Sequence, residues 1–191
     1  MRTRSQRLLS MVLALSMLLT FLPVSAFADD SSTSAAGNTH TEIVSGEGTY
    51  TYTLNANHTA TLTEFTGTGT TVNVPSSVTA NDGKTYTVTA IGDTVFANHS
   101  FTSTLSSVFL PSSIQTIGHG AFAGCSSLHK IILREGLTTV GNAAFAMAGL
   151  TEVTLPKSLK KVGDSAFGSV PTAIQTVTYT GTEDAWDKLV H

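Results

Sequence analysis

Two patterns of apolar residues recur along the second half of the chain with the same spacing. The first has the form apolar-Gly-x-x-x-Phe and occurs at Ile91–Phe96, Ile117–Phe122, Val140–Phe145 and Val162–Phe167. Its phenylalanines lie 26, 23 and 22 residues apart. The second has the form L-x-x-L-x-L and starts at Leu105, Leu128, Leu150 and Ile174. Because both patterns share one period, the chain is predicted to be built from stacked repeats.

The second pattern predicts one short strand in each repeat. Residues two apart in a strand share a face, so Val108 with Leu110, Ile131 with Leu133 and Val153 with Leu155 are expected to point into a core. Pro111 and Pro156 follow two of these strands, and Arg134 takes that place after the third. A unit this short cannot bury its apolar face alone. The repeats should therefore stack into a solenoid with a wall of parallel strands.

The first pattern predicts how the chain turns after each strand. Its glycine permits a sharp turn. Asp93, Asn142 and Asp164 follow that glycine and are expected to cap a short helical turn. The phenylalanine then inserts as an aromatic wedge into the core.

We assign the repeats to residues 91–174. The segments on either side of them are predicted to cap the stack. Residues 48–90 should form a β-rich N-terminal cap, because Thr49–Leu54 and Thr59–Phe65 alternate apolar residues with threonine around a hairpin turn. Sixteen positions separate Pro75 from Ile91, against six from Pro111 to Ile117, so this cap contains an insertion. Residues 175–191 should form a C-terminal cap of one strand and a short helix. Trp186 and Leu189 lie on one face of that helix and are expected to cover the last repeat.

The first 28 residues have the pattern of a secretory signal. Arg2, Arg4 and Arg7 precede an apolar run, Leu8–Leu22, and Ala26-Phe27-Ala28 resembles a cleavage site. The alternative, an uncleaved membrane anchor, needs roughly 20 apolar residues, and this run is shorter. Residues 29–47 are dominated by small and polar residues and are predicted to form a flexible linker.

Charge and cysteine content exclude several classes of protein. The chain has 23 charged residues among 191 and, by count, 32 threonines and 21 serines. Without residues 1–28, seven basic and 13 acidic residues remain, a formal charge of −6. An acidic chain is a poor partner for nucleic acid, and none is expected. A single cysteine excludes an internal disulfide framework and a paired-cysteine zinc site.

The longest repeat segment, Leu110–Leu128, resembles the BspA-like class of bacterial leucine-rich repeats. The typical unit of that class reads roughly I-P-x-S-V-x-x-I-G-x-x-A-F-x-x-C-x-x-L, and the resemblance covers about residues 70–182. Departures are Arg134 in place of proline, Val95 in place of alanine and a cysteine at only one position, Cys125. The resemblance implies a secreted or surface protein of bacteria, used for adhesion or binding and without enzyme activity.

The predicted fold is therefore an α/β repeat. It is a short leucine-rich-repeat solenoid with a parallel strand wall, a β-rich N-terminal cap and a short C-terminal helix cap. With four or five units, the chain is short for the family.

No catalytic, metal-binding or cofactor-binding residue is predicted. Gly163-Asp164-Ser165 looks like part of an esterase motif, but the repeat explains it better, and the G-x-S-x-G elbow is absent. The six histidines, at positions 40, 58, 99, 119, 129 and 191, lack ligand spacing. Cys125 lies beside the phenylalanine wedge and is expected to be a buried packing residue. A secreted hydrolase is thus the weakest of the functional alternatives.

The outward side of the strand wall is the candidate binding site. Alternation places five residues opposite the core: Asn73, Phe109, Ile132, Thr154 and Thr178. Phe109 and Ile132 should form a neighbouring apolar pair, and such a patch can mark a partner site. The leading hypothesis is an exported, non-catalytic module that binds a protein or glycan at the cell surface. The alternative is a structural spacer, or a fragment of a larger surface protein. The ligand, the oligomeric state, any wall attachment and whether the natural chain ends at His191 stay open.

Overall fold

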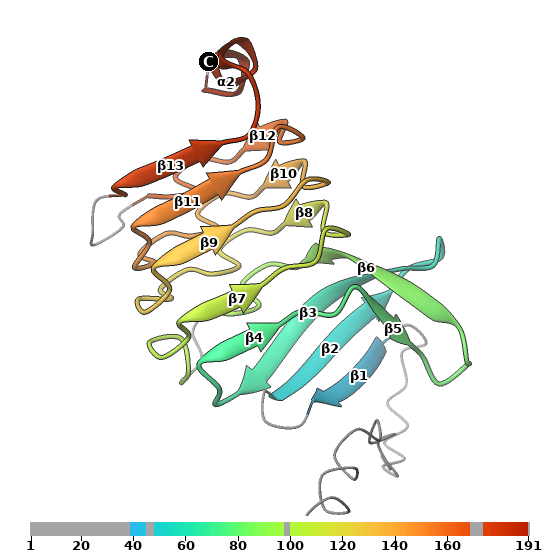
Figure 1. Cartoon of the computed structure of the whole chain (residues 1–191). Helices are drawn as coiled ribbons and strands as arrows, with labels where there is room; N and C mark the ends of the chain where they lie inside the picture. The colour runs from blue at the N-terminus through green and yellow to red at the C-terminus, as the bar shows by residue number, and fades with distance from the viewer. Residues whose placement is uncertain (1–38, 45–47, 98–99, 169–173, 191) are drawn as a thin grey trace, which may run out of the picture. The chain divides into compact units, whose positions relative to one another are not determined.

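The structure, a computed structural model, describes residues 39–44, 48–97, 100–168 and 174–190, all of which belong to the unit formed by residues 36–191. These ranges contain strands β1 to β13 and helix α2 (Figure 1). The predicted signal sequence, residues 1–28, lies outside the described residues. So does the predicted linker, except for residues 39–44.

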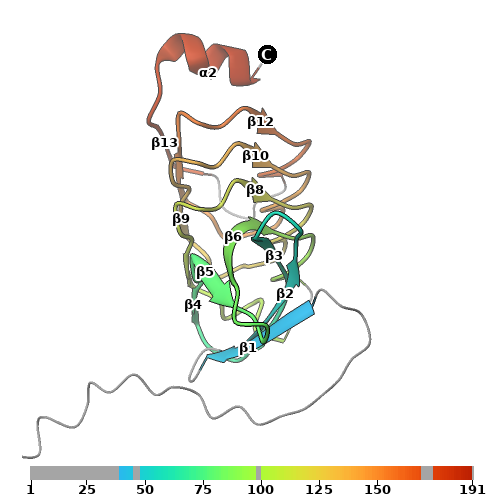
Figure 2. The same ribbon diagram turned by 90° about the vertical axis from the view of Figure 1, so that its right-hand side faces the viewer.

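Two rows of parallel strands run along the solenoid, one on each side of its core (Figure 2). The first row is the strand wall. It consists of β4 (Thr71–Asn73), β7 (Ser107–Phe109), β9 (Lys130–Ile132), β11 (Glu152–Leu155) and β13 (Thr176–Tyr179). The second row consists of β6 (Thr85–Ile91), β8 (Thr116–Ile117), β10 (Thr139–Val140) and β12 (Lys161–Val162). Four turns of the chain contribute one strand to each row, and β13 adds a fifth strand to the wall, which confirms the predicted parallel solenoid.

The N-terminal cap is a set of longer strands that continues the second row. β2 (Gly48–Leu54) and β3 (Thr59–Gly67) form the predicted antiparallel hairpin, and β3 then pairs parallel with β6. The inserted segment forms a second hairpin, in which β5 (Ser77–Thr79) pairs antiparallel with β6. The cap is therefore joined to the first repeats by backbone hydrogen bonds.

Residues 39–44 form strand β1 (Thr39–Val44), whereas the sequence pattern places them in a linker. β1 pairs antiparallel with β2 along its whole length, from Thr39 opposite Thr53 to Val44 opposite Gly48. The physical reason is the free edge of β2. Its backbone N–H and C=O groups can order a mostly polar segment that buries little apolar surface of its own.

The core is continuous from the cap to the last repeat. The six side chains predicted to point inward from β7, β9 and β11 are all buried. The rings of Phe96, Phe122, Phe145 and Phe167 stack from turn to turn, with centroids 4.8, 5.1 and 5.2 Å apart. This aromatic column confirms the predicted wedge and ties each repeat to the next.

Helix α2 (Glu183–Val190) covers the other end of the core. Trp186 and Leu189 are half-buried against it, as the helical spacing predicts, and the Trp186 ring lies 5.4 Å from that of Tyr179.

Val177 takes the place in β13 that Val153 takes in β11 and is exposed, because β13 is the edge strand of the described wall.

The turn after the glycine of each repeat is not the capped helical turn that the sequence suggests. Asp93 Oδ1 accepts a hydrogen bond from the backbone N–H of His119, one repeat further on, at 2.7 Å. Asn142 Oδ1 accepts one from the N–H of Asp164 at 3.0 Å. The next residue has a left-handed backbone in every repeat, with φ between 52° and 58° at Thr94, Gly120, Ala143 and Ser165. These side chains therefore bridge neighbouring turns instead of capping their own.

Candidate functional site

The five residues predicted for the outward side of the strand wall all lie on that side. We call them the outer strand face: Asn73, Phe109, Ile132, Thr154 and Thr178. Asn73 is directly opposite Phe109 in the ladder between β4 and β7. Ile132, Thr154 and Thr178 are aligned in the ladders of β9, β11 and β13. Thr154 is half-buried and the other four are exposed.

Phe109 and Ile132 are the apolar part of this face. Their side chains are 54% and 46% exposed, although neighbouring residues in both strands are buried. Both side chains line a hollow of about 190 Å³, which we call the Phe109 hollow. Its other walls come from β7 and β9 and include Lys130 and Arg134. The predicted apolar pair is thus brought together at a concave point of the surface.

The backbone of the wall is interrupted at the same place. β4 and β7 form one sheet, and β9, β11 and β13 form another. In the described part of the chain, no ladder joins β7 to β9. The Phe109 hollow therefore lies at the break between these two sheets.

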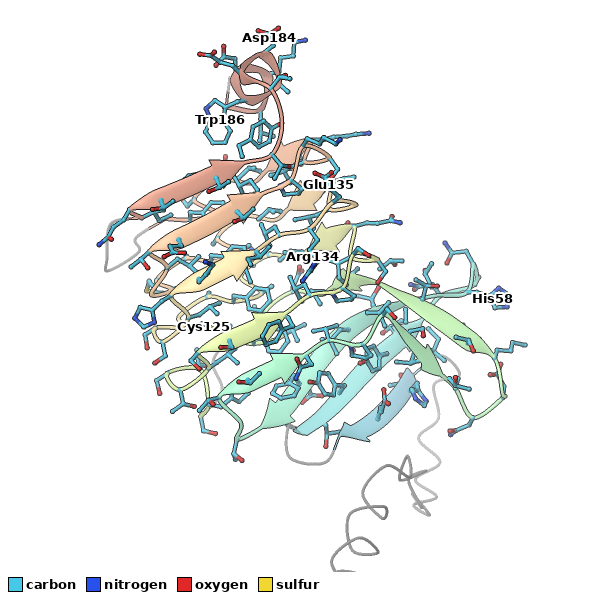
Figure 3. All side chains as sticks on the ribbon, in the orientation of Figure 1. His58, Cys125, Arg134, Glu135, Asp184 and Trp186 are labelled. Atoms are coloured by element: carbon cyan, nitrogen blue, oxygen red, sulfur yellow. The ribbon has the colours of Figure 1, made fainter. Side chains whose placement is uncertain are left out.

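Arg134, which is labelled in Figure 3, supplies a charge to the hollow that the apolar pair also lines. It lines both the Phe109 hollow and a second cavity, of about 340 Å³, that Asn73 and Phe109 also line. Lys130 is paired with Glu152 at 2.8 Å across β9 and β11. Arg134 is exposed and, among the described residues, forms no ion pair. The face thus offers a cation that a carboxylate of a partner can neutralise.

The sequence prediction of this site omitted Arg134. A signal was present, because Arg134 stands where two other repeats have proline, directly after a strand. Arg134 stands two positions after Ile132, so its long charged side chain lies on the same face as Ile132.

The residues that suggested other chemistry have structural roles. Cys125 is fully buried, its thiol lies 3.7 Å from the carbonyl oxygen of Phe96, and burial raises its pKa to about 12. The motif at 163–165 belongs to the bridging turn, where Asp164 donates its backbone N–H to Asn142 and Ser165 has a left-handed backbone. Within the described ranges, no group of three or more histidine, cysteine or acidic residues has the geometry of a metal site. Two of the six histidines, at positions 99 and 191, fall outside those ranges.

No helix among the described residues is both long enough and apolar enough to cross a bilayer.

Comparisons with known proteins agree with this architecture. The family model of the BspA type leucine-rich repeat region matches residues 71–175 as six copies. A crystal structure of a leucine-rich repeat protein from Bacteroides capillosus is 36% identical, with a TM-score of 0.63. The match covers 74% of this chain and 99% of that one. No curated protein matches the chain significantly.

Two further crystal structures are similar to this chain over most of its length. A leucine-rich cell surface protein from Faecalibacterium prausnitzii is 25% identical, with a TM-score of 0.54, over 78% of this chain and 44% of its own. A leucine-rich repeat protein from T. pallidum is 28% identical, with a TM-score of 0.54, over 69% of this chain and 62% of its own. This chain therefore spans less than two thirds of either relative. The repeat motif, the two parallel strand rows and the match over residues 71–175 show that the chain belongs to the BspA-type leucine-rich repeat family.

Proposed function

We propose that the protein is an exported, non-catalytic module that binds a protein partner at the bacterial cell surface through the outer strand face. The observation that carries the proposal is the exposed pair of Phe109 and Ile132 in the Phe109 hollow. Isolated apolar side chains on a surface need no explanation, but a concave apolar site flanked by an unpaired cation is typical of interfaces. Proteins of this family are generally repeat proteins without enzyme activity.

The chemistry of the face favours a protein over a glycan. Phe109 and Ile132 present apolar surface that an apolar side chain of a partner can cover, at about 25 cal/mol for each Å² buried. Arg134 is available for a carboxylate of the partner. We expect a partner segment that has an apolar side chain and an acidic side chain near each other.

Export is part of the same proposal. The signal pattern of residues 1–28 supports it, as does the similarity to a cell surface protein of Faecalibacterium prausnitzii. Epitope tagging followed by fractionation of the expressing bacterium tests it directly, and tagged protein that stays in the cytoplasm would contradict it.

Binding is tested with labelled protein on intact epithelial and bacterial cells, measured by flow cytometry. The double variant Phe109→Asp with Ile132→Asp should lose surface binding, because two carboxylates replace the apolar pair. Arg134→Glu should weaken binding by about tenfold or more, since it repels an acidic partner. Met147→Asp is the matched control. Met147 is 56% exposed and lies in a turn with a left-handed backbone that aspartate tolerates.

Pretreatment of the cells distinguishes the partner class. Protease treatment should abolish binding, and glycosidase treatment should leave it unchanged. If the double variant keeps its circular dichroism spectrum and still binds cells as the unaltered protein does, the outer strand face is not the binding site. The alternative of a spacer with no partner predicts no saturable binding by any variant.

A further inference from the structure

A further cavity lies in the N-terminal cap, in the part of the chain that departs from the repeat pattern. Its volume is about 490 Å³, within the range of small-molecule pockets. Three elements line it: the start of β1, the turn between β2 and β3, and the inserted β5–β6 hairpin. We call it the cap pocket. None of its lining residues lines either cavity beside Phe109.

The walls of the cap pocket are held by backbone hydrogen bonds. The N–H of Asn55 donates to the carbonyl of Thr59 at 2.8 Å and closes the β2–β3 turn. The N–H of Thr87 donates to the carbonyl of His58 at 3.0 Å and joins that turn to β6. The N–H of Ala80 donates to the carbonyl of Lys84 at 2.9 Å and closes the β5–β6 hairpin. A ligand therefore meets walls that are already placed, which lowers the entropy lost on binding.

Aromatic rings form one wall. The rings of His58 and Tyr86 lie 5.7 Å apart at an interplanar angle of 33°. His58 is exposed at the tip of its turn (Figure 3), and Tyr86 is half-buried. The face of an aromatic ring is electronegative, so it attracts the weakly positive C–H groups on one side of a pyranose ring.

Amide groups supply hydrogen bonds beside these rings. The side-chain N–H groups of Asn55 donate to the hydroxyls of Thr59 and Thr61 at 3.1 and 3.5 Å, which fixes the amide orientation. Its carbonyl oxygen then has no partner among the described residues. The Asn81 side chain likewise forms no hydrogen bond to the described part of the chain. Amide groups both donate and accept, which matches the hydroxyl groups of a sugar.

The charges that line the cap pocket neutralise each other. Lys84 Nζ lies 3.2 Å from Asp82 Oδ2, and the backbone N–H of Lys84 donates to Asp82 Oδ1 at 2.9 Å. The hydrogen bond from the Lys84 backbone and, to a smaller extent, the Lys84 side chain lower the pKa of Asp82. The Asp82 carboxylate therefore stays ionised and paired. Asp82 would repel an anionic ligand, and Lys84 would repel a cationic one. The pair therefore favours a neutral ligand.

From this geometry we propose that the cap pocket binds a neutral saccharide, with one sugar face against Tyr86 and His58 and hydroxyl groups on Asn55 and Asn81. This site is additional to the protein-binding outer strand face. It also explains why a hairpin is inserted before the first regular repeat: the insertion supplies one side of the cavity.

Saturation-transfer NMR and calorimetry with the full chain test the proposal. The probes are maltotriose, cellotriose and triacetylchitotriose, which are neutral, and trigalacturonic acid, which presents similar rings with carboxylates. We expect at least one neutral trisaccharide to bind with a Kd of about 1 mM or tighter, and trigalacturonic acid to bind more weakly. No saturation transfer from any neutral probe, or stronger binding of the acidic one, would overturn the proposal.

Variants locate the binding. Tyr86→Leu, which keeps apolar bulk but removes the ring, should weaken binding by about tenfold or more, whereas Tyr86→Phe should retain it. His58→Asn removes a ring and suits the left-handed backbone at this position, where φ is 56°. The Phe109→Asp variant should bind sugar normally, which separates this site from the outer strand face. Equal affinity of Tyr86→Leu, Tyr86→Phe and the unaltered protein would place the sugar elsewhere.

Discussion

At the scale of single residues, polar side chains form hydrogen bonds between repeats and not within them. Asp93 and Asn142 look like helix caps because each follows a glycine at the start of a turn. Each instead accepts a backbone N–H of the following repeat. The next residues, Thr94 and Ala143, do not begin a helix either, because each has a left-handed backbone that directs the chain back across the stack. Stacking thus converts a local capping signal into a contact between turns.

Tyr52 has a buried polar atom without such a partner. The ring of Tyr52 is fully buried, and its hydroxyl forms no hydrogen bond within the described residues. Burial, with a smaller contribution from Glu42, raises the pKa of this phenol. Tyr52→Phe should therefore raise the free energy of unfolding by about 1 kcal/mol, because an unpaired buried hydroxyl is removed.

The matched variant is Tyr50→Phe. The Tyr50 hydroxyl donates to the carbonyl of Asn73 at 3.4 Å, so this substitution should not stabilise the protein. Urea unfolding followed by circular dichroism measures both changes. A loss of stability in Tyr52→Phe would show that the hydroxyl is satisfied in solution.

At the scale of elements, the phenylalanine column links one repeat to the next. Consecutive rings are nearly parallel from Phe96 to Phe167, with interplanar angles of 11°, 3° and 2°. Backbone hydrogen bonds join the same turns, such as those from the Phe122 N–H to the Ala144 carbonyl and from the Phe145 N–H to the Ala166 carbonyl, each at 2.7 Å. Packing of the rings with the aliphatic residues around them adds buried apolar surface to these contacts between repeats.

Position in the column should determine the effect of removing a ring. Phe122 is fully buried between two other rings, whereas Phe167 is half-buried at the end of the column. Phe122→Ala should lower the free energy of unfolding by about 3–5 kcal/mol through cavity formation, and Phe167→Ala by clearly less. Chemical denaturation gives both values. Equal losses at the two positions would contradict a stack in which each repeat depends on both neighbours.

At the scale of the whole molecule, side chains at the ends of the wall strands connect turns that are far apart in sequence. Glu135 Oε1, after β9, accepts hydrogen bonds from the Thr180 hydroxyl at 2.9 Å and from the Lys157 N–H at 3.2 Å. Three consecutive turns therefore meet at one carboxylate. Desolvation acts to raise the pKa of Glu135, but the hydrogen bonds from Thr180 and Lys157 outweigh it and hold the pKa below its usual value.

This carboxylate predicts a pH dependence of stability. A carboxylate whose pKa is lower in the folded state than in the unfolded state stabilises the fold at any pH above its unfolded-state pKa. This contribution to the free energy of unfolding is lost as the pH falls through the folded-state pKa. Melting temperature should therefore decline as pH drops below about 4.5. Glu135→Gln should reduce that decline while leaving other carboxylates unchanged. Thermal melts from pH 7 to 3 provide the comparison, and identical slopes for the two proteins would rule out a contribution of Glu135.

The order of residues predicts the repeat period, the inward faces of the strands, the capping segments and the outward position of Phe109 and Ile132. These features depend on alternation within a strand and on spacing along the chain, and both are local properties that the order of residues determines.

The features that join distant segments come from the tertiary structure. It made residues 39–44 a strand, because the free edge of β2 orders them. It left β7 and β9 without a ladder and placed Arg134 beside the hollow between them. It also formed the cap pocket from a turn and a hairpin about 25 residues apart along the chain. Edge pairing, gaps between strands and cavities arise where separate elements meet, so no single segment of the sequence encodes them.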